Sequence, residues 1–358
     1  MNWLIVFPDY WIRFSPSTIN FIKMLKENNQ CFTVLYFTVK SMESKSLGEG
    51  FVPIYMNEKL YKILSRVKCI NLYKTIILFL QIFRVKRRLR FDKFVGFDLI
   101  GYTSLRMNFV PSIFYSLELP NYFFANFLRY FLNPTLVVSQ NLERKDYLFR
   151  SKIPKIILPN SPILFKKDFT TKLYSGKLIY FGNLISNHGI EQCIESLYLC
   201  STNSLTIKTF ISFNEEYYNF ISHKYHDLII SNRLIFDFDY IDQDNVQEYL
   251  SNFDIGFVLL NSNLLGNPNY DTIPSGKLYN YFSAGLPVIG SQFNGLKDID
   301  SFEAGIILKS NDPESINLAL ERIRDLYRTY SENSYLASIQ FDYRKHFNDS
   351  RYLLFENT

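Results

Sequence analysis

The chain has 358 residues, of which 47% are hydrophobic, 20% charged and 17% aromatic. This composition excludes a disordered chain, and the length suits two domains better than one compact core. The net charge of +5 is unevenly spread. Residues 1–165 hold 23 Lys and Arg against 10 Asp and Glu, a net charge of +13, whereas residues 166–358 hold 16 against 24, a net charge of −8. We expect the two halves to face different partners.

The four cysteines form no CxxC pair and lack the dense spacing of a disulfide scaffold, which indicates a reducing compartment. The short apolar run at 3–7 has no basic stretch before it, so it does not read as a signal peptide. No segment reaches the roughly 18 apolar residues of a spanning helix. We therefore expect a cytoplasmic protein that is soluble or peripheral to a membrane.

The first half begins with "WLIVF" (3–7) and "FTVLYF" (32–37), two short strand-like runs. Between them Ile19, Ile22 and Leu25 recur at helical spacing, which predicts a strand, helix, strand unit. Further strands are predicted at 95–102, 112–119, 135–140 and 155–162.

The second half repeats this plan. Strands are predicted at 177–183, 205–210, 233–241, 254–260, 286–290 and 305–309, with helical stretches between them and a charged helical tail. Alternating strands and helices indicate an α/β protein with two doubly wound, Rossmann-like domains facing across a cleft. We predict an N-terminal domain at 1–165, a C-terminal domain at 166–335, and a final helix at 336–358 that packs back on the N-terminal domain.

The stretch "YFGNLISNHGIEQCIESL" (180–197) links a predicted strand to a predicted helix. Gly182 and Gly189 lie at its two junctions, where glycine lets backbone amides approach a phosphate and the helix N-terminus favours an anion. The other interpretation is an ordinary strand-to-helix loop, because the spacing is not a dinucleotide fingerprint.

The stretch "IPSGKLYNYFSAGLPVIG" (273–290) is more specific. Ser275 or Gly276 can cap a helix, which places Lys277 in its first turn, where a cation is unfavourable against the helix dipole. We predict that Lys277 and the free amides bind a diphosphate. The alternative is a solvated surface lysine.

These residues carry a resemblance to a known family. The order of the glycine stretch, "RLIFDFDYID", "VQEYLSNFDIGFVLL" and "PSGKLYNYFSAGLPVIGS" resembles the nucleotide-sugar domain of GT-B glycosyltransferases of the group one (family four) class. The resemblance covers 177–310, whereas the first half matches in plan, through "VVSQNLERKDYL" and "IILPNSP". It implies transfer of a sugar from a nucleotide diphosphate sugar in the C-terminal domain to an acceptor in the N-terminal one, with no cofactor and no metal.

The resemblance also implies a donor site. Tyr240 and Ile241 would lie beside the base, and the glycine loop would face the diphosphate. Asn183 and His188 stand where many members have Arg and Lys, and Thr272 and Asn280 stand where many have two glutamates. The predicted donor-binding set is Gly182, Asn183, His188, Gly189, Tyr240, Ile241, Pro274, Ser275, Gly276, Lys277, Leu278 and Asn280. These departures leave open the donor, the stereochemistry and a second function, that of an inactive nucleotide-binding or scaffold protein.

The catalytic residues that we predict are Lys277, which would stabilise the leaving diphosphate, and one carboxylate of the first half. Glu118 follows a predicted strand and Asp9 follows the first one, and each has a structural role as its alternative. Asp237 and Asp239 have the spacing of a GT-A metal site, but the surrounding pattern is of the GT-B kind, so no metal is expected.

An apolar helical run at 72–93 ends in a basic segment with a single Asp92. Such a segment can bind an anionic membrane surface, and its alternative is a core helix with a solvated end. A nucleic-acid partner is disfavoured because no base-stacking module accompanies the charge. The predicted membrane contacts are Arg84, Lys86, Arg87, Arg88 and Arg90. The acceptor implied by the resemblance is a polyprenol-linked or other saccharide in surface polysaccharide biosynthesis.

Overall fold

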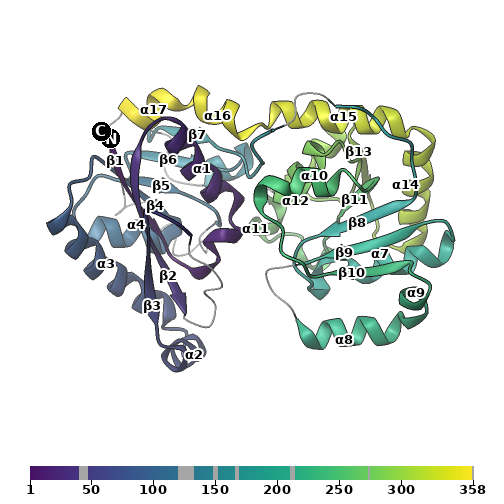
Figure 1. Cartoon of the computed structure of the whole chain (residues 1–358), viewed down its shortest axis with the longest axis horizontal. Helices are drawn as coiled ribbons and strands as arrows, with labels where there is room; N and C mark the ends of the chain where they lie inside the picture. Colours follow the sequence, from purple (N-terminus) through teal and green to yellow (C-terminus); the bar gives the residue numbers. More distant parts are fainter. Residues whose placement is uncertain are drawn as a thin grey trace. The chain divides into compact units, whose positions relative to one another are not determined.

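The computed structural model describes residues 1–39, 47–119, 133–147, 152–165, 169–209, 214–272 and 275–356. The chain forms two compact units (Figure 1). Unit 1 contains residues 1–159 and 344–358, and unit 2 contains residues 160–343, whereas the sequence suggested divisions after residues 165 and 335. Each unit is built on one parallel sheet flanked by helices, which confirms the predicted α/β fold class.

Unit 1 has a seven-stranded sheet in the order β3-β2-β1-β4-β5-β6-β7. The order reverses between β1 and β4, which is the switch point at which doubly wound sheets bind ligands. The strands are β1 (Asn2–Phe7), β2 (Cys31–Val39), β3 (Phe51–Met56), β4 (Lys93–Phe97), β5 (Ile113–Tyr115), β6 (Leu136–Ser139) and β7 (Lys155–Ile157). The helices are η1 (Tyr10–Phe14), α1 (Pro16–Glu27), α2 (Glu58–Arg66), α3 (Ile70–Arg88), α4 (Asp98–Met107) and α6 (Leu142–Tyr147).

In unit 1 one predicted strand was too long and one strand was missed. The strand predicted at 95–102 ends at Phe97, and Asp98 opens α4 with a positive φ of 49°. The edge strand β3 was missed because Pro53 interrupts its pattern and its outward residues Val52 and Tyr55 are apolar rather than polar. An edge position accepts Pro53, since the ladder there needs hydrogen bonds on one side of the strand alone.

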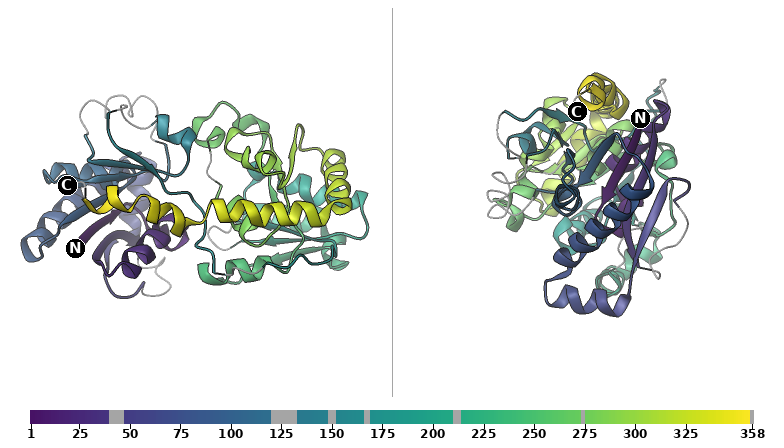
Figure 2. Two further views of the ribbon diagram at one scale, coloured as in Figure 1. Left: turned by 90° about the horizontal axis from the view of Figure 1, so that it is seen from above. Right: turned by 90° about the vertical axis from the view of Figure 1, so that its left-hand side faces the viewer.

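The core of unit 1 is rich in aromatic rings. Phe21 of α1 contacts Trp3 edge-on at a centroid distance of 6.0 Å and Tyr115 at 5.7 Å. The chain returns to this core through α16 (Tyr343–Asp349) and α17 (Arg351–Glu356), drawn in yellow beside the purple N-terminal elements (Figure 2). Phe347 packs on Phe21 at 5.9 Å, and Phe355 packs on Trp3 at 5.6 Å. The end of the chain is therefore part of the unit 1 core.

Unit 2 has a six-stranded sheet in the order β10-β9-β8-β11-β12-β13, which reverses between β8 and β11. The strands are β8 (Lys177–Phe181), β9 (Ser204–Lys208), β10 (Leu234–Asp237), β11 (Ile255–Val258), β12 (Val288–Ser291) and β13 (Gly305–Leu308), which confirms all six predicted strands of this half. The α-helices are α7 (Ile190–Ser196), α8 (Glu215–Lys224), α9 (His226–Ile230), α10 (Val246–Leu250), α11 (Pro268–Asp271), α12 (Gly276–Ser283), α13 (Asp298–Ser301), α14 (Pro313–Asp325) and α15 (Tyr327–Gln340). Short 3-10 helices are η3 (Ser186–His188), η4 (Leu197–Leu199), η5 (Gln243–Asn245), η6 (Ser262–Leu264) and η7 (Asn294–Leu296).

Strand β8 shows why unit 2 buries both faces of its sheet. Its residues alternate between two apolar cores, with Leu178 and Tyr180 in one and Ile179 and Phe181 in the other. Strands covered on both faces are apolar throughout, which is why their runs were easy to recognise in the sequence.

Candidate functional site

The candidate site lies at the carboxyl edge of the unit 2 sheet, where β8 leads into a glycine-containing loop. Gly182 follows β8 with a φ of 152°, and a Cβ placed on it would lie 3.0 Å from Cδ of Lys277. Gly189 closes the loop with a φ of 60°, and a Cβ there would lie 2.6 Å from Cβ of Leu259, which follows β11. Glycine is therefore required at both positions, because the loop passes close to Lys277 on one side and to the end of β11 on the other.

Lys277 meets two rings of this loop region. Its Nζ donates to Oη of Tyr180 at 3.2 Å and lies 4.5 Å from the centre of the Tyr180 ring. Nδ1 of His188 is 3.5 Å from the same Nζ. Three segments that are far apart in the sequence thus converge: the end of β8, the loop before α7 and the first turn of α12.

The hydrogen bonds of Tyr180 define the state of His188. The hydroxyl of Tyr180 donates to the carbonyl of Asn183 at 2.7 Å, and Nδ1 of His188 lies 2.7 Å from the same oxygen. Because a hydroxyl has one hydrogen to donate, this arrangement assigns the proton of a neutral His188 to Nδ1. Burial and the nearby Lys277 lower the pKa of His188 to about 3, so this ring is neutral at physiological pH.

Lys277 is the cation of this cluster. Removal of water around its ammonium group lowers the pKa of Lys277 to about 8, although the side chain as a whole is partly exposed. At pH 7 most molecules still carry the charge. An ammonium group has three N–H donors, and one of them is used on Tyr180. The remaining donors can bind an anion.

The first turn of α12 adds backbone donors to this cation. Ser275 is the N-cap residue, but its side chain makes no capping hydrogen bond, and no acidic residue lies in the first turn. The next residue is Gly276, and a Cβ added at this position would lie 3.0 Å from Nδ2 of Asn160, so a larger residue would crowd Asn160. Free N–H groups and a lysine at a helix N-terminus are the elements of a phosphate site. Pro274 of the predicted set lies outside the described residues.

The other predicted donor residues are placed differently. Leu278 is fully buried in the apolar core, and Asn280 is buried with its carbonyl accepting from Oγ of Ser283 at 2.7 Å. Tyr240 is exposed, and Ile241 packs partly against the core beyond the end of β10. Close contacts and hydrogen bonds join Gly182, Asn183, His188 and Lys277 into one cluster.

Asp237 at the end of β10 is held by a buried lysine that sequence reasoning missed. Nζ of Lys208 lies 2.5 Å from Oδ1 of Asp237, and the hydroxyl of Tyr249 donates to Oδ2 at 2.7 Å. Asp239 lies beyond the strand, and its N–H donates to Asp237 at 3.0 Å. Burial opposes the ionisation of Asp237, but these hydrogen bonds outweigh it and lower its pKa. The carboxylate of Asp237 is therefore part of an ion pair with Lys208. The described residues contain no group of His, Cys, Asp and Glu suited to a metal ion.

The two carboxylates predicted in unit 1 lie after the carboxyl ends of β1 and β5, two strands of the same sheet. Asp9, after β1, caps η1 by accepting from the N–H of Tyr10 at 3.0 Å and pairs with the buried Lys74 of α3 at 2.6 Å. Glu118, after β5, is exposed, and its own N–H donates to Oδ1 of Asp98 at 3.0 Å. Asp9 is therefore an ion-paired carboxylate, whereas Glu118 is an exposed side chain on an anchored backbone.

Asp98 and Arg144 anchor the loop that carries Glu118. Oδ1 of Asp98 accepts from the N–H of Leu117 at 2.7 Å, and the guanidinium of the buried Arg144 donates to the carbonyl of Leu117 and to Oε1 of Gln140. Burial raises the pKa of Asp98 to about 7, because the backbone donors and Arg144 compensate only in part for the lost water. Sequence reasoning missed Asp98, since 95–102 was interpreted as a strand, and it assigned no role to Arg144.

The basic segment predicted to contact a membrane divides into two groups. Arg84, Arg87, Arg88 and Arg90 are exposed. Lys86 instead contacts other residues of unit 1: its Nζ donates to the carbonyl of Asn108 at 3.3 Å and lies over the Phe94 ring. Burial lowers the pKa of Lys86. No helix in the described part of the chain combines the length and apolar character needed to span a membrane.

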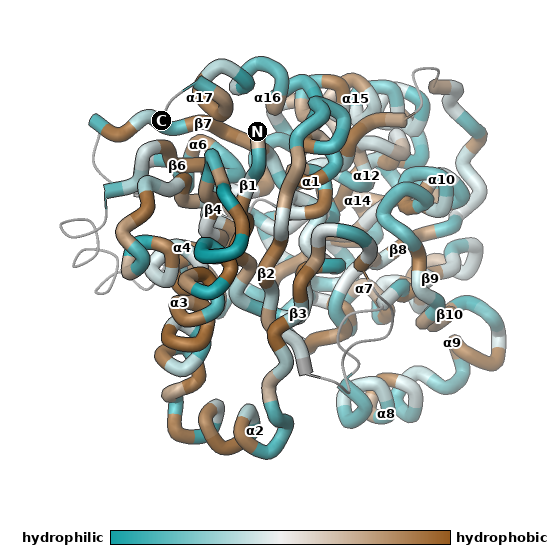
Figure 3. Tube along the Cα trace, turned by 60° about the vertical axis from the view of Figure 1, so that its left-hand side comes forward, coloured by the Kyte–Doolittle hydropathy of each residue, from teal (hydrophilic) through white to brown (hydrophobic). Residues whose placement is uncertain are grey.

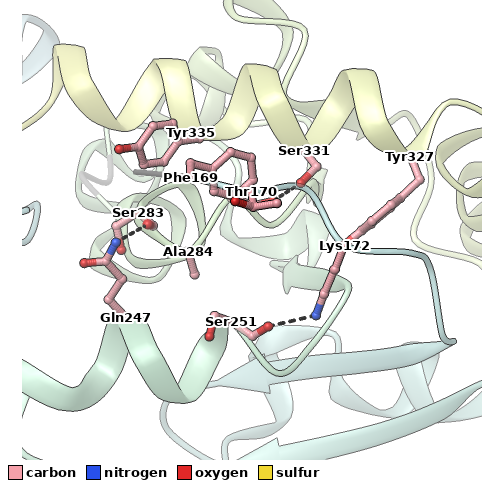
Figure 4. Close-up of a pocket in the computed structure, with 11 residues that line it drawn as sticks. Phe169, Thr170, Lys172, Gln247, Ser251, Ser283, Ala284, Tyr327, Ser331 and Tyr335 are labelled. Atoms are coloured by element: carbon pink, nitrogen blue, oxygen red, sulfur yellow. Dashed lines mark hydrogen bonds between the residues drawn. The ribbon is translucent and has the colours of Figure 1, made fainter. Parts of the chain in front are cut away.

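Two cavities of unit 2 lie apart from this cluster. In one, of about 240 Å³, two polar side chains are already paired: Nζ of Lys172 donates to the carbonyl of Ser251 at 2.9 Å, and Nε2 of Gln247 donates to that of Ser283 at 2.7 Å (Figure 4). The other, of about 630 Å³, opens beyond the carboxyl ends of β11, β12 and β13 and is lined mainly by Ser, Asn and Gln. Among the described residues, none of the predicted donor-binding set lines either cavity.

Comparison with known proteins places the chain by its fold. No family model and no curated protein matches the sequence. Solved structures do match over the whole chain. Sucrose-phosphate synthase from Thermosynechococcus elongatus aligns with a TM-score of 0.68 at 14% identity, covering 100% of both chains.

Two further structures agree with that comparison. A glycosyltransferase from Rickettsia africae has a TM-score of 0.68 at 13% identity, covering 99% of both chains. Anabaena HepE in complex with UDP and glucose has a TM-score of 0.68 at 11% identity, covering 99% of this chain and 100% of that one. These identities support a statement about the fold alone. The chain has a GT-B-like fold with two parallel α/β sheets of seven and six strands.

Proposed function

We propose that this protein is a glycosyltransferase that binds a nucleoside diphosphate sugar at the carboxyl edge of unit 2. The acceptor in this proposal is a polyprenol-linked or other saccharide of surface polysaccharide biosynthesis, bound by unit 1. The observation that carries the proposal is the environment of Lys277, a desolvated cation beside the uncapped first turn of α12.

Comparison with two other lysines supports this interpretation of Lys277. Lys74 and Lys208 are buried, and each has a carboxylate within 2.6 Å, Asp9 and Asp237 respectively. Among the described residues, Lys277 donates to the neutral Tyr180 and lies beside the neutral His188, with no carboxylate at ion-pair distance. A desolvated charge without a counter-ion is costly. A diphosphate would supply the missing negative charge.

The chemistry of sugar transfer matches these donors. As the bond between the sugar and the diphosphate breaks, negative charge builds on the leaving phosphate oxygens. Lys277 and the amides at the start of α12 would stabilise that charge through charge-assisted hydrogen bonds, and Gly182 would let the chain pass close to the phosphates. Neighbouring structures bound to UDP-2-fluoro glucose, UDP-glucose and UDP make UDP the first nucleotide to test.

For the acceptor we propose Glu118 as the general base. Its side chain is exposed at the carboxyl edge of unit 1, and the bond from its N–H to Asp98 fixes its backbone. A carboxylate in this setting can accept the proton of an acceptor hydroxyl as the new glycosidic bond forms. Asp9 is the second candidate, but its carboxylate is already engaged in the ion pair with Lys74.

The first test is a thermal shift assay without added metal, using UDP, GDP, ADP and dTDP, with CMP as the control. We expect one nucleoside diphosphate to raise the melting temperature clearly and CMP to raise it little, because binding to the native state stabilises it. The absence of a shift with every diphosphate would contradict the donor site. A shift seen only with Mn²⁺ would instead support a metal-dependent site.

The second test separates an enzyme from a nucleotide-binding scaffold. The protein is incubated with a saccharide acceptor extracted from membranes and with the sugar conjugate of the nucleoside diphosphate that gave the thermal shift. An enzyme should release the free nucleoside diphosphate. Glu118→Gln should lower that turnover by about 100-fold or more while the thermal shift stays unchanged. Binding without any turnover in the wild type would favour the scaffold function, which the absence of the paired glutamates at Thr272 and Asn280 also favours.

A further inference from the structure

The outward face of α3 is apolar, which is the reverse of the usual arrangement for a surface helix. Its inward face is buried through Lys74, Leu78 and Ile82. The opposite face carries a stripe at helical spacing whose members are each at least 41% exposed, namely Leu72, Ile76, Leu80 and Phe83. A solvated helix is expected to show polar residues on the face away from the core. A continuous apolar stripe there indicates an interaction surface.

Helix α2 extends the same feature. It contains no buried residue, and Leu60, Ile63 and Val67 on it are between 36% and 58% exposed. Nζ of Lys74 lies 5.9 Å from the centre of the Tyr61 ring, so α2 and the start of α3 are in contact. Figure 3 shows brown, hydrophobic segments along both helices. We call the exposed apolar residues of α2 and α3 the docking face; they are Leu60, Ile63, Val67, Leu72, Ile76, Leu80 and Phe83.

The charges around the docking face are almost all positive. Exposed basic residues of this region outnumber the exposed acidic residues, Glu58 and Asp92, by eight to two. The basic residues are Lys59, Lys62, Arg66, Lys68, Arg84, Arg87, Arg88 and Arg90. Arg87 lies 4.2 Å over the ring of Phe83, so a guanidinium sits directly on the last apolar residue of the stripe. Apolar and cationic groups thus share one surface.

We propose that the docking face binds the surface of an anionic phospholipid bilayer. The apolar stripe would enter the boundary between headgroups and acyl chains, and the arginines would remain at the level of the phosphates, as in interfacial amphipathic helices. Two copies of this chain paired through the face would bring like charges together, which is unfavourable. A nucleic acid would leave the apolar stripe unsatisfied. Charge complementarity therefore selects the membrane.

The structure changes which residues make this contact. Lys86 is excluded, because its ammonium group is bound to Asn108 and its pKa is lowered by burial. The apolar residues of α2 are included. Lys74 lies over the Tyr61 ring of α2 and pairs with Asp9 after β1, which places α2 near the carboxyl edge of the unit 1 sheet. If the proposed function holds, docking would bring this edge close to a lipid-linked acceptor. The binding itself does not depend on that function.

The test is flotation of the full chain with phosphatidylcholine vesicles that contain either no anionic lipid or about 30% phosphatidylglycerol. We expect flotation with the anionic vesicles alone, and its loss at high salt. Ile76→Ser with Leu80→Ser removes the apolar contact, and Arg87→Gln, Arg88→Gln and Arg90→Gln together remove the cationic one. Each set should reduce the bound fraction by about tenfold or more.

Matched controls keep the result interpretable. Leu318→Ser with Leu336→Ser changes two leucines of unit 2 that are 66% and 57% exposed, and it should leave flotation unchanged. All variants should keep the wild-type thermal shift with nucleotide, so failure of membrane binding is distinguishable from failure of the donor site. Flotation that survives both sets of substitutions would overturn the proposal. So would a dimer in light scattering that the serine variant dissociates, because the face would then bind a second copy.

Discussion

The carboxyl edges of the two sheets differ in how their charged side chains are paired. In unit 2 the cation Lys277 has neutral partners, Tyr180 and His188. In unit 1 two of the carboxylates have partners of their own, with Asp9 paired to Lys74 and Asp98 accepting two backbone N–H groups. One edge is therefore short of negative charge and the other is internally balanced. This difference matches an anionic donor on unit 2 and a neutral hydroxyl acceptor on unit 1.

The comparison is tested most strongly by removing the cation. Lys277→Ala should weaken nucleoside diphosphate binding by about 100-fold, because it removes charge-assisted hydrogen bonds of about 1.5–3 kcal/mol. Isothermal titration calorimetry measures this directly. Lys177→Ala is the matched control, since Lys177 is exposed at the amino end of β8 in the same unit. If Lys277→Ala binds the nucleoside diphosphate as tightly as the wild type does, the difference in charge between the two edges has no role in donor binding.

Breaking the balanced edge should cost stability rather than binding. Asp9→Asn keeps the cap on η1 and removes the charge that faces Lys74, which is 4% exposed. We expect the free energy of unfolding to fall by about 2 kcal/mol, below the full range for buried pairs because Asp9 is partly exposed. Urea denaturation gives the value. Adding Lys74→Met should restore most of the loss, and a double variant as unstable as the single one would argue against an ion-pair role.

The pH dependence of binding should report Lys277 itself. With a pKa of about 8, Lys277 is charged below that pH and loses its charge above it, whereas the terminal phosphate gains its second charge near pH 6. Affinity for the diphosphate should therefore peak between roughly pH 6.5 and 8 and fall by about eightfold from pH 7.5 to pH 9. Lys277→Arg, which stays charged, should lack the alkaline decrease. A decrease that persists in this variant would assign it to another group.

The smallest effect is expected at Asp98. Its pKa is raised to about 7 in the folded chain, so the folded state binds more protons than the unfolded state between about pH 4 and pH 7, and stability falls as pH rises through that window. Asp98→Asn keeps an oxygen for Leu117 and Glu118 but cannot ionise. The wild type should lose stability between pH 4 and pH 8 while the variant does not, so the variant should equal the wild type at pH 4 and be the more stable of the two at pH 8. Destabilisation at pH 8 would mean that Asp98 is needed as a charge beside Arg144.

The sequence pattern was sufficient to predict a feature where that feature depends on one helix or strand alone. The six strands of unit 2 were recognisable because strands buried on both faces are continuously apolar, as the alternating cores on β8 show. The position of Lys277 in a first helical turn was predictable because Ser275 or Gly276 can cap a helix. Asp98 was not, since the residues after it are apolar enough to continue a strand, and the helix starts there through a positive φ that the sequence does not reveal.

By itself the sequence determined the two doubly wound sheets, the turn that carries Lys277 and the excess of positive charge in the first half. The tertiary structure alone decided which charges are neutralised. It brought Lys208 to Asp237 and Lys74 to Asp9, and it gave Lys277 two uncharged rings. It also decided that the apolar stripe of α3 faces outward. The physical reason is that periodicity reports on one element at a time, whereas a charge is balanced by residues that the order of the strands places beside it.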